Sequence, residues 1–162
     1  EFDFEVKSKQ EENLSAKSTK GRANSGKVAP QKIGQPSIKK FCEKFSIEEV
    51  SNESVKQYIK TNPHIVLECM LTNTFKCPIL YFVKGDNTIR FIKLIKPIDW
   101  TKFEFSWTNN WLTTGGTCLK LKEKNISIVE FQIHNTRKNM ALRWYFEKLL
   151  TEFSGHFEIV SI

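Results

Sequence analysis

The chain opens with the stretch Glu1-Phe2-Asp3-Phe4-Glu5-Val6-Lys7-Ser8-Lys9. Its apolar residues alternate with charged ones, a period of two that predicts a half-buried strand. In such a strand one face packs on a core, and the other carries the charged side chains on one side. Glu5 and Lys7 would then lie on the same face, about 6.5–7 Å apart at Cα.

The charged face of this strand combines carboxylates with an amine. Carboxylate oxygens are the hard ligands that Mg²⁺ prefers. A nearby cation can stabilise a charged phosphate or the attacking water in the hydrolysis of a phosphodiester. The alternative interpretation is an amphipathic edge strand whose charges are simply solvated. Asp3 and the strongly basic segment that follows favour the catalytic interpretation.

The segment Asp3-Phe4-Glu5-Val6-Lys7-Ser8-Lys9 resembles the second catalytic strand of the PD-(D/E)XK nuclease superfamily, which includes many type II restriction endonucleases. The resemblance implies that Glu5 is a metal ligand and Lys7 the catalytic lysine, with Asp3 as a further metal ligand and Mg²⁺ as the cofactor. It also implies a restriction-endonuclease-like mixed α/β sheet flanked by helices. The expected substrate is double-stranded DNA.

The first Asp of that superfamily normally lies upstream of the acid-x-Lys strand, and here nothing precedes Glu1. Either the sequence is the C-terminal portion of a longer enzyme, or Asp3 substitutes for the missing ligand, or the resemblance is accidental. All three alternatives stay open at the level of the sequence.

Composition and length predict one folded domain over residues 1–162 that binds a polyanion. The chain is 40% hydrophobic, contains thirteen Phe, four Trp and three Tyr, and has a formal net charge of +7. A positive net charge favours nucleic acid as the partner. No apolar run is long enough for a membrane span. The four cysteines form no C-x-x-C pair, which predicts free thiols in a reducing cytoplasm rather than structural zinc.

Residues 10–37 are rich in Ser, Lys, Gly, Asn and Gln and predict a mobile basic loop. No acidic residue occurs between Lys17 and Lys40, so we expect the segment to become ordered on DNA, with cations on phosphates and amides free to read bases. The alternative is a disordered linker. The candidate DNA-binding residues of this segment are Lys20, Arg22, Asn24 and Lys27.

The remaining patterns predict a mixed sheet with helices. Helices are expected over 37–45, with Ser37 as cap, and over 53–60. Strands are expected at 64–71, 77–84, 89–95 and 157–162, with a hairpin formed by 119–121 and 126–134. A last helix is expected to begin at Asn135 or Thr136 and to pair Arg143 with Glu147 at i,i+4.

A second acid-x-amide pair occurs in the strand 126–134. Glu130 and Gln132 fall on one face of this strand, and some members of the same superfamily use Gln in place of the catalytic Lys, so this pair is the alternative catalytic site. If the first strand is catalytic, the polar face of the second is expected to read bases, since Gln and Asn can each form two hydrogen bonds with adenine. The candidate DNA-binding residues here are Gln132, His134, Asn135, Arg137 and Lys138.

These observations lead to one prediction with two alternatives. The prediction is a Mg²⁺-dependent, sequence-specific DNA endonuclease of restriction type. Residues 17–40 and 132–143 are expected to hold the duplex. The enzyme is expected to act as a homodimer, because sequence-specific cutting usually pairs two active sites across a two-fold axis. The alternatives are a non-catalytic DNA-binding module that uses the basic loop and the C-terminal helix, and a protein-interaction domain.

Overall fold

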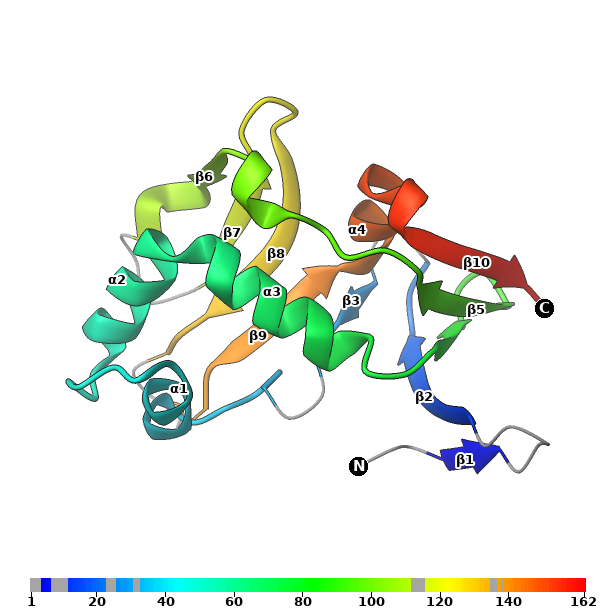
Figure 1. Cartoon of the computed structure of the whole chain (residues 1–162), viewed down its shortest axis with the longest axis horizontal. Helices are drawn as coiled ribbons and strands as arrows, with labels where there is room; N and C mark the ends of the chain where they lie inside the picture. Colours follow the sequence, from blue (N-terminus) through cyan, green and yellow to red (C-terminus); the bar gives the residue numbers. More distant parts are fainter. Residues whose placement is uncertain are drawn as a thin grey trace. The chain divides into compact units, whose positions relative to one another are not determined.

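The computed structural model describes residues 4–6, 12–22, 26–30, 33–111, 116–134, 137 and 139–162, and at 4–6, 12, 109 and 110 only their backbone. The chain divides into two compact units that alternate along the sequence (Figure 1). Unit 1 comprises residues 1–28, 74–98 and 145–162, and unit 2 comprises residues 29–73 and 99–144. Both units combine helices with a sheet, so the predicted mixed α and β class is confirmed.

Unit 1 is built on a five-stranded sheet in the order β1-β2-β4-β5-β10. Strands β2 and β4 are parallel, and the other neighbours are antiparallel. Helix α4 and a short 3₁₀ helix follow one another just before the last strand. The bounds are β1 Phe4–Val6, β2 Glu12–Thr19, β3 Lys27–Val28, β4 Ile79–Val83, β5 Thr88–Leu94, α4 Phe146–Glu152, η4 Ser154–His156 and β10 Phe157–Ser161.

Aromatic rings fill the core of unit 1. Alternate residues of β4 are buried, as expected for a strand with one face on a core, and Tyr81 among them is fully buried. The ring of Phe146, at the start of α4, meets the Tyr81 ring edge-on at 4.9 Å. Phe75 lies 5.0 Å from Phe157 and 6.0 Å from Phe146 between ring centres. These contacts fix α4 and β10 to the sheet.

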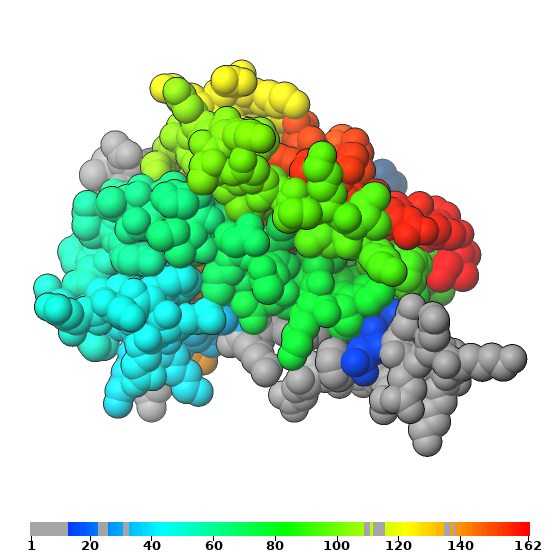
Figure 2. Space-filling model, viewed as in Figure 1, coloured from blue at the N-terminus to red at the C-terminus, as the bar shows by residue number. Residues whose placement is uncertain are grey.

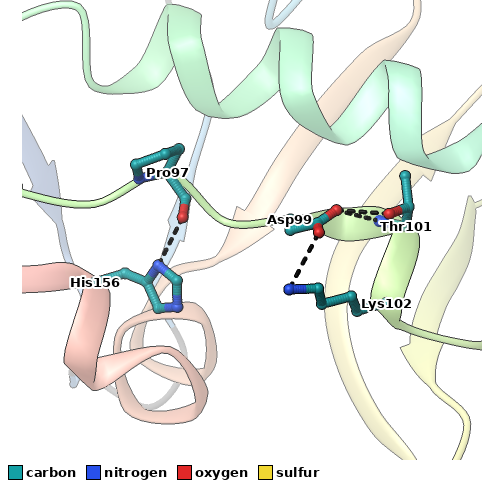
Figure 3. Close-up of polar contacts among 5 residues, drawn as sticks. All are labelled: Pro97, Asp99, Thr101, Lys102 and His156. Carbon is teal, nitrogen blue, oxygen red and sulfur yellow. Dashed lines mark hydrogen bonds and ion pairs between the residues drawn. The ribbon is translucent and has the colours of Figure 1, made fainter.

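Strand β10 forms one edge of the sheet in unit 1, and a histidine holds the connection that follows β5. Strand β10, red in Figure 2, lies at the surface and leaves Ile159 and Val160 exposed, as expected for the last strand of the order. The ring of His156 lies with Nδ1 2.9 Å from the carbonyl oxygen of Pro97 (Figure 3). The tautomer with a proton on Nδ1 donates this hydrogen bond and holds the connection after β5 against η4.

Unit 2 contains three helices and a sheet in the order β9-β8-β7-β6, all antiparallel (Figure 1). Ser37 caps the first helix by accepting a hydrogen bond from the Lys40 N–H, which confirms the predicted cap. Asp99 caps a 3₁₀ helix through Thr101 and pairs with Lys102 (Figure 3). The bounds are α1 Ile38–Phe45, α2 Asn52–Thr61, α3 Pro63–Thr74, η2 Trp100–Lys102, β6 Phe105–Trp107, η3 Thr108–Trp111, β7 Gly116–Leu121, β8 Ile126–Gln132 and β9 Ala141–Tyr145.

The core of unit 2 lies on one face of its sheet. Val129 pairs with Trp144 and Phe131 with Leu142 across β8 and β9, and all four side chains are fully buried. Trp100 stacks on Trp144 with ring centres 5.9 Å apart. Cross-strand partners share a face of a sheet, so their neighbours Glu130, Gln132, Ala141 and Arg143 fall on the opposite face.

The strand expected at residues 64–71 is wrong, because this segment lies in helix α3. An apolar run without alternation fits either a buried strand or a buried helix. The buried positions Val66, Leu67, Met70 and Leu71 are spaced as on one face of a helix. Pro63 is the first residue of α3, a position that proline favours.

The prediction of a helix that begins at Asn135 or Thr136 is also wrong. Both the residue at which the helix begins and the ion pair expected within it differ in the structure. Residues 141–145 form strand β9, and α4 begins only at Phe146. Met140, Leu142 and Trp144 are buried at alternate positions, the period of a strand. Arg143 pairs with Glu130 and not with Glu147.

The segment predicted as a mobile loop, residues 10–37, contains strand β2 over Glu12–Thr19. This strand is hydrogen-bonded to β1 on one side and to β4 on the other. Backbone pairing therefore holds a segment that has few apolar side chains. By contrast, the structure confirms the other predicted elements. They are the helices near 37–45 and 53–60, the strands near 77–84 and 89–95, the hairpin and the last strand.

None of the helices in the described part of the chain has both the length and the apolar character needed to span a membrane. All four cysteines are free thiols, as predicted. Burial raises the pKa of Cys69 and of Cys42, which favours the protonated thiol over the reactive thiolate at neutral pH.

Candidate functional site

The opening stretch forms a strand where the structure describes it. Phe4–Val6 is strand β1, and Glu5 is the antiparallel partner of Asn13 on β2. Asp3, Lys7 and the Glu5 side chain lie outside the described residues. The strand predicted from alternation is therefore confirmed over these three residues, and the roles of its charged groups stay a prediction.

The predicted DNA-binding cations of unit 1 lie after β2 and at β3. Lys20, Arg22 and Lys27 are exposed, whereas Asn24 lies outside the described residues. The turn between β4 and β5 positions the segment of Lys20 and Arg22, because the Gly85 N–H donates a hydrogen bond to the Gly21 carbonyl at 3.2 Å. A Cβ at Gly85 would lie 2.6–2.7 Å from the backbone of Gly21 and Arg22. The contact thus requires glycine at this turn.

Two cations share one aromatic ring in unit 1. The Lys27 Nζ lies 5.1 Å and the Lys148 Nζ 5.3 Å from the centre of the Tyr145 ring. The π-electrons of a tyrosine attract ammonium groups at such distances. Two ammonium groups held around one ring form a concentrated positive charge that suits a phosphate. From the sequence, Lys27 was named as a candidate but Lys148 was not.

The polar face of the sheet in unit 2 carries a cross-strand ion pair. Glu130 of β8 is the direct partner of Arg143 of β9, and its Oε2 lies 2.7 Å from the Arg143 Nη2. The Glu130 side chain is 10% exposed and that of Arg143 31%, so the carboxylate lies beneath the guanidinium. Gln132, the other half of the predicted alternative pair, is the partner of Ala141 on the same face.

A cavity of about 350 Å³ opens on this face. The backbone of residues 34–37 runs beside β9 and closes one side, with the Leu142 N–H bonded to the Gly34 carbonyl and the Met140 N–H to the Pro36 carbonyl. Amides and guanidinium groups dominate its lining. The lining side chains with hydrogen-bonding groups are Gln35, Gln132, Arg137, Asn139 and Arg143.

The predicted DNA-binding residues of unit 2 fall around this cavity. Gln132 and Arg137 line it, and His134 is half-buried next to them in sequence, with its carbonyl accepting a hydrogen bond from the Arg137 N–H. Asn135 and Lys138 lie outside the described residues. Gln35 and Asn139 lie within the segments 17–40 and 132–143 that were expected to hold the duplex, but they were not named as candidates. The pairing of Ser37 with Asn139 brings their backbones together.

Among the described residues, no three His, Cys, Asp or Glu side chains gather as a metal site would need. Asp3 and the Glu5 side chain lie outside the described residues, so the predicted ligand pair stays a prediction. The cavity of unit 2 has no carboxylate among its lining residues.

One curated protein is similar to this chain along most of its length. The type II restriction enzyme CviAII of Paramecium bursaria Chlorella virus 1 is 38% identical over 152 residues, which cover 90% of this chain and 43% of the enzyme. The chain therefore spans less than half of the relative that it matches. No family model matches the sequence, and no solved structure matches it significantly. The chain is thus similar, over 90% of its length, to a part of a type II restriction enzyme.

Proposed function

We propose that the chain is part of a Mg²⁺-dependent DNA endonuclease of restriction type that hydrolyses phosphodiester bonds in double-stranded DNA at a specific sequence. The observation that carries the proposal is the similarity of 90% of the chain to a type II restriction enzyme. The acid-x-Lys sequence Glu5-Val6-Lys7, of which Glu5 and Val6 lie in β1, and the net charge of +7 support it independently. We assign the fold to the restriction-endonuclease class on the same grounds.

Glu5 and Asp3 are the proposed metal ligands, and their chemistry fits the ion, because both supply the carboxylate oxygens that Mg²⁺ prefers. The described backbone places Glu5 in a strand that is paired along β2, a rigid support for a ligand. A bound Mg²⁺ would supply Lewis-acid stabilisation of the phosphate. Lys7 would orient the attacking water or stabilise the negative charge that develops on the phosphate oxygens.

The geometry of unit 2 favours Glu5 and Lys7 over Glu130 and Gln132 as the catalytic pair. The Glu130 carboxylate is buried and 2.7 Å from Arg143, so a cation already neutralises it. Guanidinium groups next to the site would repel Mg²⁺. We therefore assign Glu130 and Gln132 to DNA recognition rather than to metal binding.

The DNA would be held by cations of both units. In unit 1 these are Lys20, Arg22 and the pair Lys27 and Lys148 around Tyr145. In unit 2 they are Arg137 and Arg143 at the cavity. Cleavage of both strands of a symmetric site would require two copies of the enzyme, so the proposal includes a homodimer.

The test is Lys7→Ala in the full-length protein, with Lys102→Ala as the control. Lys102 is exposed and pairs with Asp99, so its removal changes the charge equally at a place outside the proposed site. Cleavage of a plasmid library of varied sequence and methylation is measured with Mg²⁺, and duplex binding is measured with Ca²⁺. Lys7→Ala should lose cutting about 10²–10³-fold and keep binding, as expected for loss of one electrostatic contact in the transition state.

Three outcomes would change the assignment. If Lys7→Ala cuts as fast as the unmutated protein, Lys7 has no catalytic role. If Glu130→Gln loses cutting that saturating DNA does not restore, the catalytic role belongs to the second strand. If the unmutated full-length protein binds DNA but cuts none of the library, the alternative of a non-catalytic DNA-binding module is supported.

A further inference from the structure

The cavity of unit 2 contains a fixed hydrogen-bonding pattern that the proposed chemistry of cleavage does not use. Glu130 and Arg143 are direct cross-strand partners, and Gln132 and Ala141 are the next pair on the same face. Ala141 has no long side chain, so it leaves space between the two polar groups. The face is therefore a shallow polar recess between a guanidinium and an amide.

The ion pair fixes the orientation of Arg143. An arginine side chain loses rotamer entropy when it becomes ordered. The Glu130 Oε2 lies 2.7 Å from Nη2 and is itself held by a strand whose neighbours Val129 and Phe131 are fully buried. A guanidinium presents five N–H donors in a planar fork. One side of this fork is directed to Glu130, and the side chain still has 31% of its surface exposed.

Gln132 has room for its side chain because its cross-strand partner is a glycine. Gly116 of β7 is its cross-strand partner, and a Cβ at Gly116 would lie 3.1 Å from the Gln132 Cγ and 3.5 Å from its Nε2. A larger residue at this position would therefore push the amide away from its place. Gly116 allows Gln132 to line the cavity beside Arg143.

The groups of the cavity select one class of ligand. Two guanidinium groups and three carboxamides offer many donors, and no carboxylate lines the wall, so a metal ion is disfavoured. An arginine held by a carboxylate is already partly neutralised, which makes it less suited to a phosphate than the paired lysines at Tyr145. The planar fork matches the O6 and N7 acceptors of guanine in the major groove, and a Gln amide matches adenine.

We propose that this cavity is a base-reading site in which Arg143, oriented by Glu130, recognises the edge of a guanine and Gln132 contacts the neighbouring base pair. The inference rests on the proposed function, because it concerns how the same enzyme selects its DNA. Arg143 is a specificity-determining residue, and Glu130 is a positioning residue that acts through it. Catalysis itself takes place elsewhere, at Glu5 and Lys7.

The experiment selects DNA from a library of randomised duplexes with the full-length protein in Ca²⁺. The unmutated protein should select a sequence that contains a G·C pair. Arg143→Lys keeps the charge but loses the planar fork. It should lose preference at that one position by about 10- to 100-fold, the range expected for a bidentate pair. Glu130→Gln should give a smaller loss at the same position and nowhere else.

Replacement of the selected guanine by 7-deazaguanine tests the contact directly, because it removes the N7 acceptor. The unmutated protein should lose affinity for the modified duplex, whereas Arg143→Lys, which lacks the planar fork, should lose less affinity on the same replacement. Conservative variants are used because Arg143→Ala would leave a buried carboxylate without its cation, which destabilises the folded protein. Thermal unfolding of each variant checks that the fold is kept.

The outcomes separate the inference from the function on which it rests. If Arg143→Lys and the unmutated protein select the same sequence with equal strength, the inference is wrong. A uniform loss of affinity over all sequences, with a smaller dependence on salt, would make Arg143 a phosphate contact and would also overturn it. If the unmutated protein binds no duplex at all, it is the proposed function that fails.

Discussion

Arg90 and Glu147 form a two-contact ion pair between strand β5 and helix α4, far apart in sequence but adjacent in unit 1. The Arg90 Nη1 donates to the Glu147 Oε2 at 3.0 Å, and Nη2 donates to Oε1. Both side chains are 17% exposed. The guanidinium also lies 5.2 Å from the centre of the buried Tyr81 ring. The hydrogen bond to Glu147 raises the pKa of Arg90, which favours the charged guanidinium.

This pair should contribute to stability more than an exposed pair of similar length. Glu147→Ala leaves the Arg90 cation buried without its partner and should lower the free energy of unfolding by about 3 kcal/mol. Glu104→Ala is the matched control, since Glu104 lies 2.8 Å from Lys122 but both side chains are more than 60% exposed. Urea unfolding should show little change for this control. Equal losses for the two variants would contradict the argument.

Gly85 and Gly155 should respond in opposite ways to the same substitution. Gly85→Ala would place a Cβ 2.6–2.7 Å from the backbone of Gly21 and Arg22, so that segment must move, at a cost of about 1–3 kcal/mol. A Cβ at Gly155 meets nothing within 4 Å, and Gly155→Ala should be neutral or slightly stabilising. Thermal unfolding measures both. We also expect Gly85→Ala to weaken DNA binding, because it displaces Arg22.

The stability of unit 1 should fall in alkaline solution because of Tyr81. Burial, and then the charge of Glu147, raise the pKa of Tyr81 to about 12. A raised pKa in the folded state means that the contribution to stability is fully present below about pH 10 and is lost as the pH rises towards 12.

Tyr81→Phe removes this titration. It also removes a buried hydroxyl that has no hydrogen-bond partner in the described part of the chain, so the variant should be at least as stable as the unmutated protein at pH 7. Unfolding midpoints measured from pH 8 to 11 should fall less steeply for Tyr81→Phe. Parallel curves for the two proteins would show that another group controls the alkaline loss.

The two lysines around Tyr145 should each contribute one phosphate contact. Lys27→Ala and Lys148→Ala should weaken duplex binding in Ca²⁺ uniformly over sequences, and each should reduce the slope of log affinity against log salt by about 0.9. Lys102→Ala carries the same change of charge and should leave the slope unaltered. A sequence-dependent effect of Lys27→Ala would instead indicate a base contact.

Local patterns predicted the elements whose signals were unambiguous. Ser37 before an amphipathic segment marked a helix start, and Asp86 and Asn87 marked the turn between β4 and β5. The segment 64–71 was misread because an apolar run of this kind contains no period by itself. Strand β2 was missed because one of the two strands that pair with it, β4, is distant in sequence.

The candidate site could be predicted only in part, because it too depends on pairing between strands that the sequence pattern does not reveal. Alternation on β8 placed Glu130 and Gln132 on one face, which is correct. The partner of Glu130 was not predicted, since it depends on the register of β8 against β9. Alternation of Met140, Leu142 and Trp144 was the signal that could have revealed β9 and placed Arg143 opposite Glu130.

The interleaving of the two units along the chain has a consequence for how the protein acquires its structure during synthesis. Strand β2 ends at Thr19, but its parallel neighbour β4 begins at Ile79 and the edge strand β10 only at Phe157. Long-range pairing of this kind slows folding, because chain entropy is lost before the contacts compensate for it. The segment that contains β1 and β2 is therefore translated before its sheet partners β4, β5 and β10, and this sheet can be completed only after residue 161 has been synthesised.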